Sequence, residues 1–137
     1  MAEDGAHDLI AAASGQPPGS LRAAVANAMV GLKKRHYGRG PEGAKAFVED
    51  DYIFVVLDGG LTRNEETLLA AGREDLVRQY RLAFQEAVEP TATGAVEELT
   101  GRKVIGYHSQ IVFDPVRAFE IFVLAPEDGP PAAHGPQ

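Results

Sequence analysis

A helical segment followed by two strand-forming segments occurs twice along this chain, and this order most constrains the fold. The first helix is expected over residues 20–37, where Ser20 can act as the N-cap and apolar residues recur three and four positions apart. Two strands are expected over residues 46–49 and 52–57, on either side of a polar Asp-Asp turn. This part of the sequence therefore predicts a helix packed on a β-hairpin.

The second unit contains two helices before its strands. Residues 62–71 begin with Thr-Arg-Asn-Glu, which matches a capping box, and predict a short helix. A longer helix is expected over residues 73–100, with a kink or a restart at Pro90 because proline lacks a backbone N–H. Residues 103–113 and 117–124 predict the last two strands, which an Asp-Pro turn joins.

The predicted order α-β-β-α-α-β-β indicates an α+β fold with two layers, a four-stranded, mainly antiparallel sheet with helices on one face. Residues 20–125 are expected to form this single domain. Residues 1–19 and 126–137 are rich in alanine, glycine and proline, and predict disordered tails. With 45% of its 137 residues apolar, the chain is long enough to bury a core.

The formal net charge of −7 lies mostly outside the predicted domain. Five of the 20 acidic residues and none of the 13 basic residues are in the end segments, so the domain itself is close to neutral. The missing nucleic-acid-binding motifs argue against nucleic acid as a partner. No apolar run approaches the roughly 18–20 residues of a membrane span. The acidic N-terminus is unlike a signal peptide, so a cytoplasmic protein is expected.

The predicted sheet has apolar residues on both faces. Two apolar sets alternate in the second strand: Ile53, Val55 and Leu57 on one side, and Tyr52, Phe54 and Val56 on the other. A sheet covered by helices on one face needs only one apolar set. We therefore expect a homodimer that packs sheet face against sheet face through Phe54, Val56, Phe122 and Leu124. The alternative is that the long helix or a tail of the same chain folds over this face.

Residues 33–41, Lys-Lys-Arg-His-Tyr-Gly-Arg-Gly-Pro, form the densest cluster of candidate binding groups. The first three cations are explained by the carbonyl end of the first helix, which they complement. Arg39 lies beyond that end, between Gly38 and Gly40, and together with Tyr37 it is a candidate site for a small anion. The alternative is an ordinary helix end with Gly38 as its C-terminal cap.

His108 and Arg81 complete the candidate set. Strand alternation predicts His108 on the second sheet face, with Phe54 and Phe122, as a proton-transfer group or a buried interface histidine. Arg81 on the long helix is a candidate anion contact, and a pair with an acidic residue of its own helix is the favoured alternative. The sequence contains no metal-ligand spacing and no cysteine, and neither a metal nor a cofactor is expected.

Several motifs together resemble the MpsC family, which includes the YbcI-like proteins. They are Tyr37-Gly38-Arg39-Gly40-Pro41, Leu61-Thr62, Arg81, Glu98-Leu99-Thr100-Gly101 and the strand with His108. The resemblance covers about residues 20–125. It implies a small α+β domain associated with a sodium-linked, membrane-potential-generating or inorganic-carbon (bicarbonate) uptake system. It brings no established catalytic residues to this chain.

These features lead to two expected functions. The first is a non-enzymatic binding or regulatory module, a dimer that accompanies a membrane transport or signalling protein and whose Arg39 loop contacts a small anion or an acidic partner. The second is a small-molecule enzyme or anion sensor, in which Arg39 holds the anion and His108 transfers a proton. The lack of a convergent nucleophile, metal set or carboxylate pair favours the first.

Overall fold

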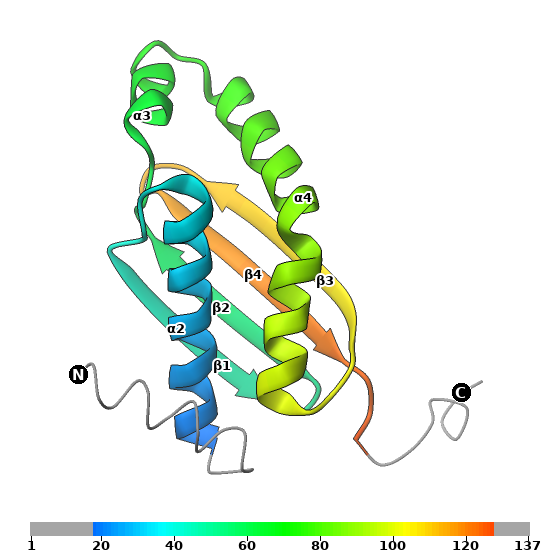
Figure 1. The fold of residues 1–137 in the computed structure, drawn as a ribbon. Coiled ribbons are helices and arrows are strands. Elements are labelled where there is room, and N and C mark those ends of the chain that lie inside the picture. The colour runs from blue at the N-terminus through cyan, green and yellow to red at the C-terminus, as the bar shows by residue number, and fades with distance from the viewer. Residues whose placement is uncertain (1–17, 128–137) are drawn as a thin grey trace.

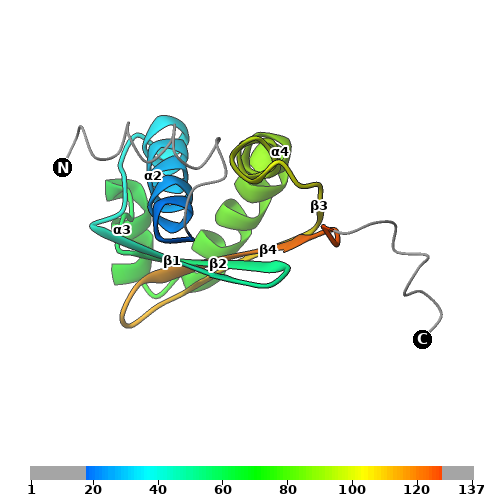
Figure 2. The ribbon, with the colours of Figure 1, turned by 90° about the horizontal axis from the view of Figure 1, so that it is seen from below.

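The computed structural model describes residues 18–127 and confirms the predicted α+β fold (Figure 1). Its elements are α2 (Pro18–Tyr37), β1 (Gly43–Glu49), β2 (Tyr52–Asp58), α3 (Arg63–Ala70), α4 (Glu74–Thr100), β3 (Val104–Val112) and β4 (Arg117–Leu124). The strands form one antiparallel sheet in the order β1-β2-β4-β3. Helices α2 and α4 lie on one face of this sheet, as Figure 2 shows, and α3 contacts α4.

Apart from shifts of one residue, the structure differs from the sequence prediction at the start of α2, at the start of β1, which is Gly43 instead of residue 46, and at Pro90. Helix α2 begins at Pro18, two residues before the predicted cap, because proline is well suited to the first turn, where its missing N–H would have no partner. Apart from a few residues at their inner ends, the two predicted tails lie outside the described residues.

Helix α4 continues through Pro90 without a restart. Val88 and Ala92, on either side of the proline, are both buried in the core, and this packing favours a continuous helix.

The main core lies between the sheet and two helices, α2 and the C-terminal half of α4. Its most buried members include Val25 and Met29 of α2, Ile53 and Val55 of β2, and Phe122 of β4. A smaller cluster joins the loop before α3, the start of α4 and the end of β3: Leu61, Val77 and Ile111. The helices are therefore fixed to one sheet face by apolar burial, which is the dominant favourable term in folding.

The strand register corrects half of the predicted dimer surface. Ile53 pairs with Phe122 and Phe54 pairs with Ile121, and residues that face each other across two strands lie on the same side of a sheet. Phe122 and Leu124 therefore lie on the helix-covered face, where they are 0% and 2% exposed. Alternation separates the two sets within each strand, but only the pairing register determines which sets of two strands share a face.

Candidate functional site

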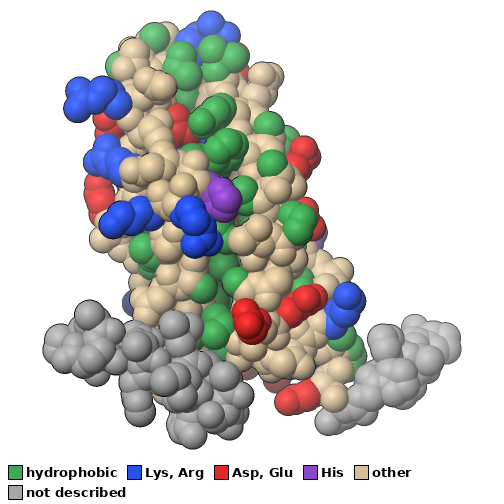
Figure 3. Space-filling model, viewed as in Figure 1, with side chains coloured by type: hydrophobic (Ala, Val, Ile, Leu, Met, Phe, Trp, Pro, Cys, Tyr) green, Lys and Arg blue, Asp and Glu red, His purple; other side chains and the backbone are tan. Residues whose placement is uncertain are grey.

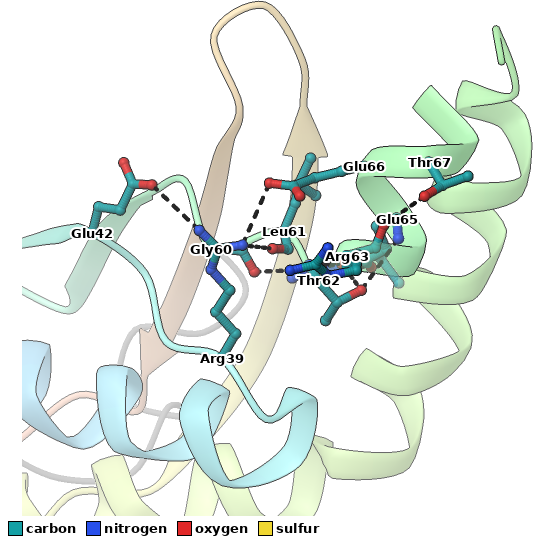
Figure 4. A network of polar contacts seen from close by, with 10 residues as sticks. Arg39, Glu42, Gly60, Leu61, Thr62, Arg63, Glu65, Glu66 and Thr67 are labelled. Carbon is teal, nitrogen blue, oxygen red and sulfur yellow. Dashed lines mark hydrogen bonds and ion pairs between the residues drawn. The ribbon is translucent and has the colours of Figure 1, made fainter. Parts of the chain in front are cut away.

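Arg39 connects the turn after α2 to the loop before α3 (Figure 4). Its Nη1 donates hydrogen bonds to the carbonyl oxygen of Leu61 at 2.9 Å and to Glu66 Oε2 at 3.4 Å. Its Nη2 lies 4.0 Å from Glu42 Oε2. The turn itself is set by Gly38, which has a φ of 81° and donates its N–H to the carbonyl of Lys34, as expected for a glycine that ends a helix.

These contacts bear on the predicted anion site at Arg39. The Arg39 side chain is 47% exposed, but two carboxylates, of Glu42 and Glu66, already lie beside its guanidinium. A bound anion would have to compete with both. Anion binding by Arg39, with Tyr37, Gly38 and Gly40, stays a prediction, whereas the geometry directly supports a role for Arg39 in holding two loops together.

Arg81 lies deeper and forms an ion pair that the sequence analysis did not predict. It was expected to pair within α4, but its Nε and Nη2 each donate a 2.6 Å hydrogen bond to the carboxylate of Glu65 on α3. Nη2 also donates to the carbonyl of Gly60 at 3.2 Å. Glu65 in turn accepts the backbone N–H of Thr62 at 2.8 Å, which completes the predicted capping box of α3. Arg78, by contrast, pairs with Glu74 one turn earlier on α4, with 3.7 Å between Nη1 and Oε1.

The buried position of this pair shifts the pKa values around it. Burial opposes ionisation of Glu65, but the hydrogen bonds from Arg81 and Thr62 outweigh it and hold the pKa of Glu65 below its ordinary value. The guanidinium of Arg81 lies over the ring of Tyr37, 4.0 Å from its centroid, in a cation–π contact. Burial raises the pKa of Tyr37 to about 12, although the charge of Arg81 opposes this rise.

A second buried ion pair joins α2 to the sheet. Lys33 Nζ lies 3.0 Å from Glu120 Oε2, and the two side chains are 6% and 1% exposed. Ser109 Oγ donates to the same carboxylate at 2.9 Å, and the hydroxyl of Tyr107 donates to its other oxygen. Burial, together with the charge and hydrogen bonding of Glu120, raises the pKa of Tyr107. Every oxygen of this buried carboxylate thus has a donor.

Sequence reasoning missed this pair, although one signal was present. Glu120 alternates in step with Ala118 and Phe122, so it belongs to the helix-facing set of β4. A charged residue within a buried strand set predicts a partner from the layer above, because an unpaired buried charge is very costly. Lys33 was assigned to the carbonyl end of the first helix, and its position on the inner side of α2 was not recognised.

The two buried pairs favour a structural role over a reactive one. Each charge has a counter-charge, and both carboxylates also accept hydrogen bonds, as a stable buried ion pair requires. Among residues 18–127, no group of three or more His, Asp or Glu side chains is placed to hold a metal ion. In the same range, no helix combines the length and apolar character needed to cross a membrane.

His108 lies apart from these groups. It pairs with Ile121 on β4 and therefore shares a face with Phe54 but not with Phe122, which corrects the predicted grouping. His108 is exposed and lines a hollow of about 700 Å³ at the β3 side of the sheet. Arg39 lines a different hollow, of about 360 Å³, with Glu66 and other residues around the loop before α3. The structure does not bring the two candidate residues of the enzyme hypothesis into one cavity.

The helix-free side of the sheet carries a continuous apolar surface, which we call the open face. It consists of Phe54 and Val56 of β2 with Phe119, Ile121 and Val123 of β4. Phe54 stacks on Phe119 with 5.8 Å between ring centroids, and Phe47 of β1 extends the row at 6.2 Å from Phe54. Phe47 is 46% exposed. Figure 2 shows that no described helix lies against this side.

Comparison with known proteins gives one match. The model of a protein family described as "Na+-translocating membrane potential-generating system (MpsC)" matches residues 18–126. Neither the curated proteins nor the solved structures searched contain a significant match to the chain. The matched range coincides almost entirely with the residues that fold into the helices and sheet described above.

Proposed function

The chain belongs to the MpsC family, and from this premise we propose that it is a non-enzymatic accessory module of a sodium-linked or bicarbonate membrane transport system. The module acts as a homodimer that packs open face against open face. The family description supplies the link to a Na+-translocating system. The observation that carries the binding role is the open face itself, an apolar surface on the helix-free side of the sheet.

The chemistry of the open face favours a second copy of the chain as its cover. An exposed large apolar side chain that becomes fully buried contributes roughly 1.5–3 kcal/mol, and one that is already partly buried contributes in proportion to the area it still exposes. Phe54, Val56, Phe119, Ile121 and Val123 supply five such side chains from each copy, and all five are partly exposed in the single chain. In a dimer with a twofold axis through this face, the five side chains of one copy would be buried against the same five of the other copy, as in other isologous dimers.

The paired buried charges support the non-enzymatic reading. A reactive site usually leaves a nucleophile, a base or an acid exposed to substrate in a cavity. Here the buried charged groups form two ion pairs. Arg81 pairs with Glu65, and Lys33 pairs with Glu120. The enzyme hypothesis based on Arg39 and His108 gains no support from their positions in separate hollows.

The dimer is tested by light scattering of the full chain after gel filtration. We expect the mass of a dimer at micromolar concentration, and a monomer for Ile121→Thr combined with Phe119→Thr. Threonine keeps strand propensity while it removes apolar area. Tyr80→Thr is the matched control, because Tyr80 is 49% exposed on α4, away from the open face. A monomeric wild-type chain, or dimers that resist the double substitution, would contradict the proposal.

The accessory role is tested in the source organism by deletion of the gene. We expect a smaller sodium-dependent membrane potential, measured with a potential-sensitive dye, and recovery with the wild-type gene. The gene with both threonine substitutions on the open face is expected to restore only part of the membrane potential. The Tyr80→Thr gene is expected to restore it fully. An unchanged potential in the deletion strain, at both low and high bicarbonate, would overturn the accessory role.

A further inference from the structure

Strand β3 forms an outer edge of the sheet. It has β4 on one side, and the sheet order places no described strand on the other. Residues Gly106–Val112 run in unbroken antiparallel register with β4, and the one irregularity lies before them, between Val104 and Gly106. The outer backbone N–H and C=O groups of alternate residues in this stretch therefore point away from the sheet, as in any edge strand.

The two edges of the sheet differ in how they are protected. Natural proteins discourage pairing at an edge strand with charged residues, proline or bulges. The opposite edge, β1, contains Lys45 and Glu49. Strand β3 contains no Lys, Arg, Asp, Glu or Pro. Of the two edges, the Gly106–Val112 stretch of β3 is thus the one with no charge, proline or irregularity against a further strand.

The hollow of about 700 Å³ follows this edge. On the helix side it is lined by α4, through Leu82, the buried Gln85, Glu86 and Glu89. On the other side it reaches His108 and Phe119 at the rim of the open face. A strand added beside β3 would direct one row of alternate side chains toward α4 and the other row along the open face.

The charges along the hollow are of one sign. Glu86 and Glu89 are both exposed, and they are the two fixed charges among the described residues that line it. In Figure 3, separate acidic side chains lie along the right-hand side, among apolar and uncharged groups, whereas most of the visible Lys and Arg side chains lie on the opposite side. An added strand would therefore be favoured by Lys or Arg in the row that faces α4.

We propose that the β3 edge binds an extended peptide segment in which basic and apolar residues alternate. Main-chain hydrogen bonds to β3 provide affinity, and the basic row faces Glu86 and Glu89. The apolar row continues the open face beyond His108, so the added strand widens that surface and leaves it free to dimerise. The choice of partner rests on the proposed function, because basic segments flank the cytoplasmic ends of membrane spans.

The binding test uses the full chain and a fluorescein-labelled peptide of alternating lysine and valine, as long as Gly106–Val112. We expect saturable binding by fluorescence anisotropy at low salt. Glu86→Lys with Glu89→Lys should weaken it by about tenfold or more, because two attractive charges become repulsive. Glu49→Lys with Glu98→Lys is the matched control, since both sites are exposed and outside the hollow, and it should bind like the wild type.

Strand addition is separated from simple charge attraction by two modified peptides. One carries N-methyl groups on the backbone nitrogens of its valines, and the other on those of its lysines. Each modified peptide therefore lacks the N–H donors along one side of its strand. We expect one of the two to lose binding and the other to retain it. In hydrogen exchange measured by NMR, the unmodified peptide should protect alternate amides of β3 and leave those of β1 unchanged.

Three outcomes would overturn the proposal: no binding of the lysine–valine peptide, equal binding to the charge-reversed protein, or equal binding of both methylated peptides. None of these depends on the membrane-potential experiment. If the deletion strain loses potential while the peptide fails to bind, the accessory role stands and the β3 site falls. If the peptide binds as expected but the deletion has no effect, the site stands and its membrane partner falls.

Discussion

Arg81 of α4 and Glu65 of α3 form a bidentate ion pair, with two hydrogen bonds of 2.6 Å between side chains that are only 4% and 2% exposed. The same Glu65 carboxylate caps α3 through Thr62, and Arg81 also holds the carbonyl of Gly60. One pair thus fixes the short helix, the loop before it and the long helix relative to one another. Arg39 adds a more exposed contact to the same loop.

Removing one member of this pair should strongly destabilise the fold. Arg81→Met leaves the Glu65 carboxylate buried without its partner, and such changes cost about 3–5 kcal/mol. The free energy of unfolding, measured by urea denaturation, should fall by this amount. In the double variant with Glu65→Gln, much of the loss should be recovered, because no buried charge remains unpaired.

Arg78→Met is the control for this prediction. Arg78 lies on the same helix, and its pair with Glu74 is about half exposed on both sides, so its loss should cost less than about 1 kcal/mol. Equal costs for Arg81→Met and Arg78→Met would show that the buried pair does not contribute as we expect.

The lowered pKa of Glu65 predicts a loss of stability in acid. A carboxyl whose pKa is lower in the folded state stabilises the fold above its unfolded pKa, near 4.5, and this contribution disappears as the pH falls through the folded pKa. The wild-type chain should therefore lose more stability below pH 4.5 than Glu65→Gln does. Urea denaturation over a series of acidic pH values measures the difference, and Glu66→Gln, at the exposed neighbour, should follow the wild type.

The two buried tyrosines should respond differently to loss of their hydroxyls. Tyr107→Phe removes a donor from the buried carboxylate of Glu120 and should cost about 1–3 kcal/mol. The hydroxyl of Tyr37 is buried without a hydrogen-bond partner among the described residues, so Tyr37→Phe should be close to neutral. Thermal denaturation should show a larger loss of stability for Tyr107→Phe than for Tyr37→Phe. A larger loss for Tyr37→Phe would contradict the prediction.

Tyr37 also predicts a loss of stability in alkali. Its pKa rises from 10.0 to about 12 in the folded chain, because burial disfavours the phenolate; the free energy of unfolding should therefore fall as the pH rises from 10 to 12. Ultraviolet titration should show a late phenolate transition that is missing in Tyr37→Phe. An identical titration curve for the two proteins would contradict the prediction.

Gly60 should be far less replaceable than Gly72. Both have positive φ values, 87° and 77°, so alanine meets a similar conformational cost of about 1–2 kcal/mol at each. A Cβ at Gly60 would also lie 3.1 Å from the Cα of Pro41, whereas a Cβ at Gly72 would have no neighbour within 4 Å. Urea denaturation should therefore show a larger loss for Gly60→Ala, and equal losses would exclude the close approach to Pro41.

Local features of this fold could be predicted because their causes are local. The capping box of Thr62 and Glu65 depends on residues three positions apart, and the structure confirms it. The bounds of β4 follow from a run of strand formers after a turn, and the structure has the same bounds. The element order, and with it the α+β class, needs no more than such local signals.

The candidate site was harder to predict, because its contacts join distant segments. Arg81 was expected to find an acid on its own helix, but burial selects Glu65, 16 positions earlier, since a bidentate partner can offset the cost of removing the guanidinium from water. Lys33 and Glu120 lie 87 positions apart by number and meet only when α2 packs on the sheet. No spacing rule connects them.

The sequence by itself determined the helices, the strands and the presence of two apolar sets in the sheet. Only the tertiary structure decided which sets face the helices, because a shift of one residue in register exchanges the two faces of a strand. It placed Phe122 in the core and Ile121 beside Phe54, so the open face and the unpaired edge of β3 are properties of the assembled sheet.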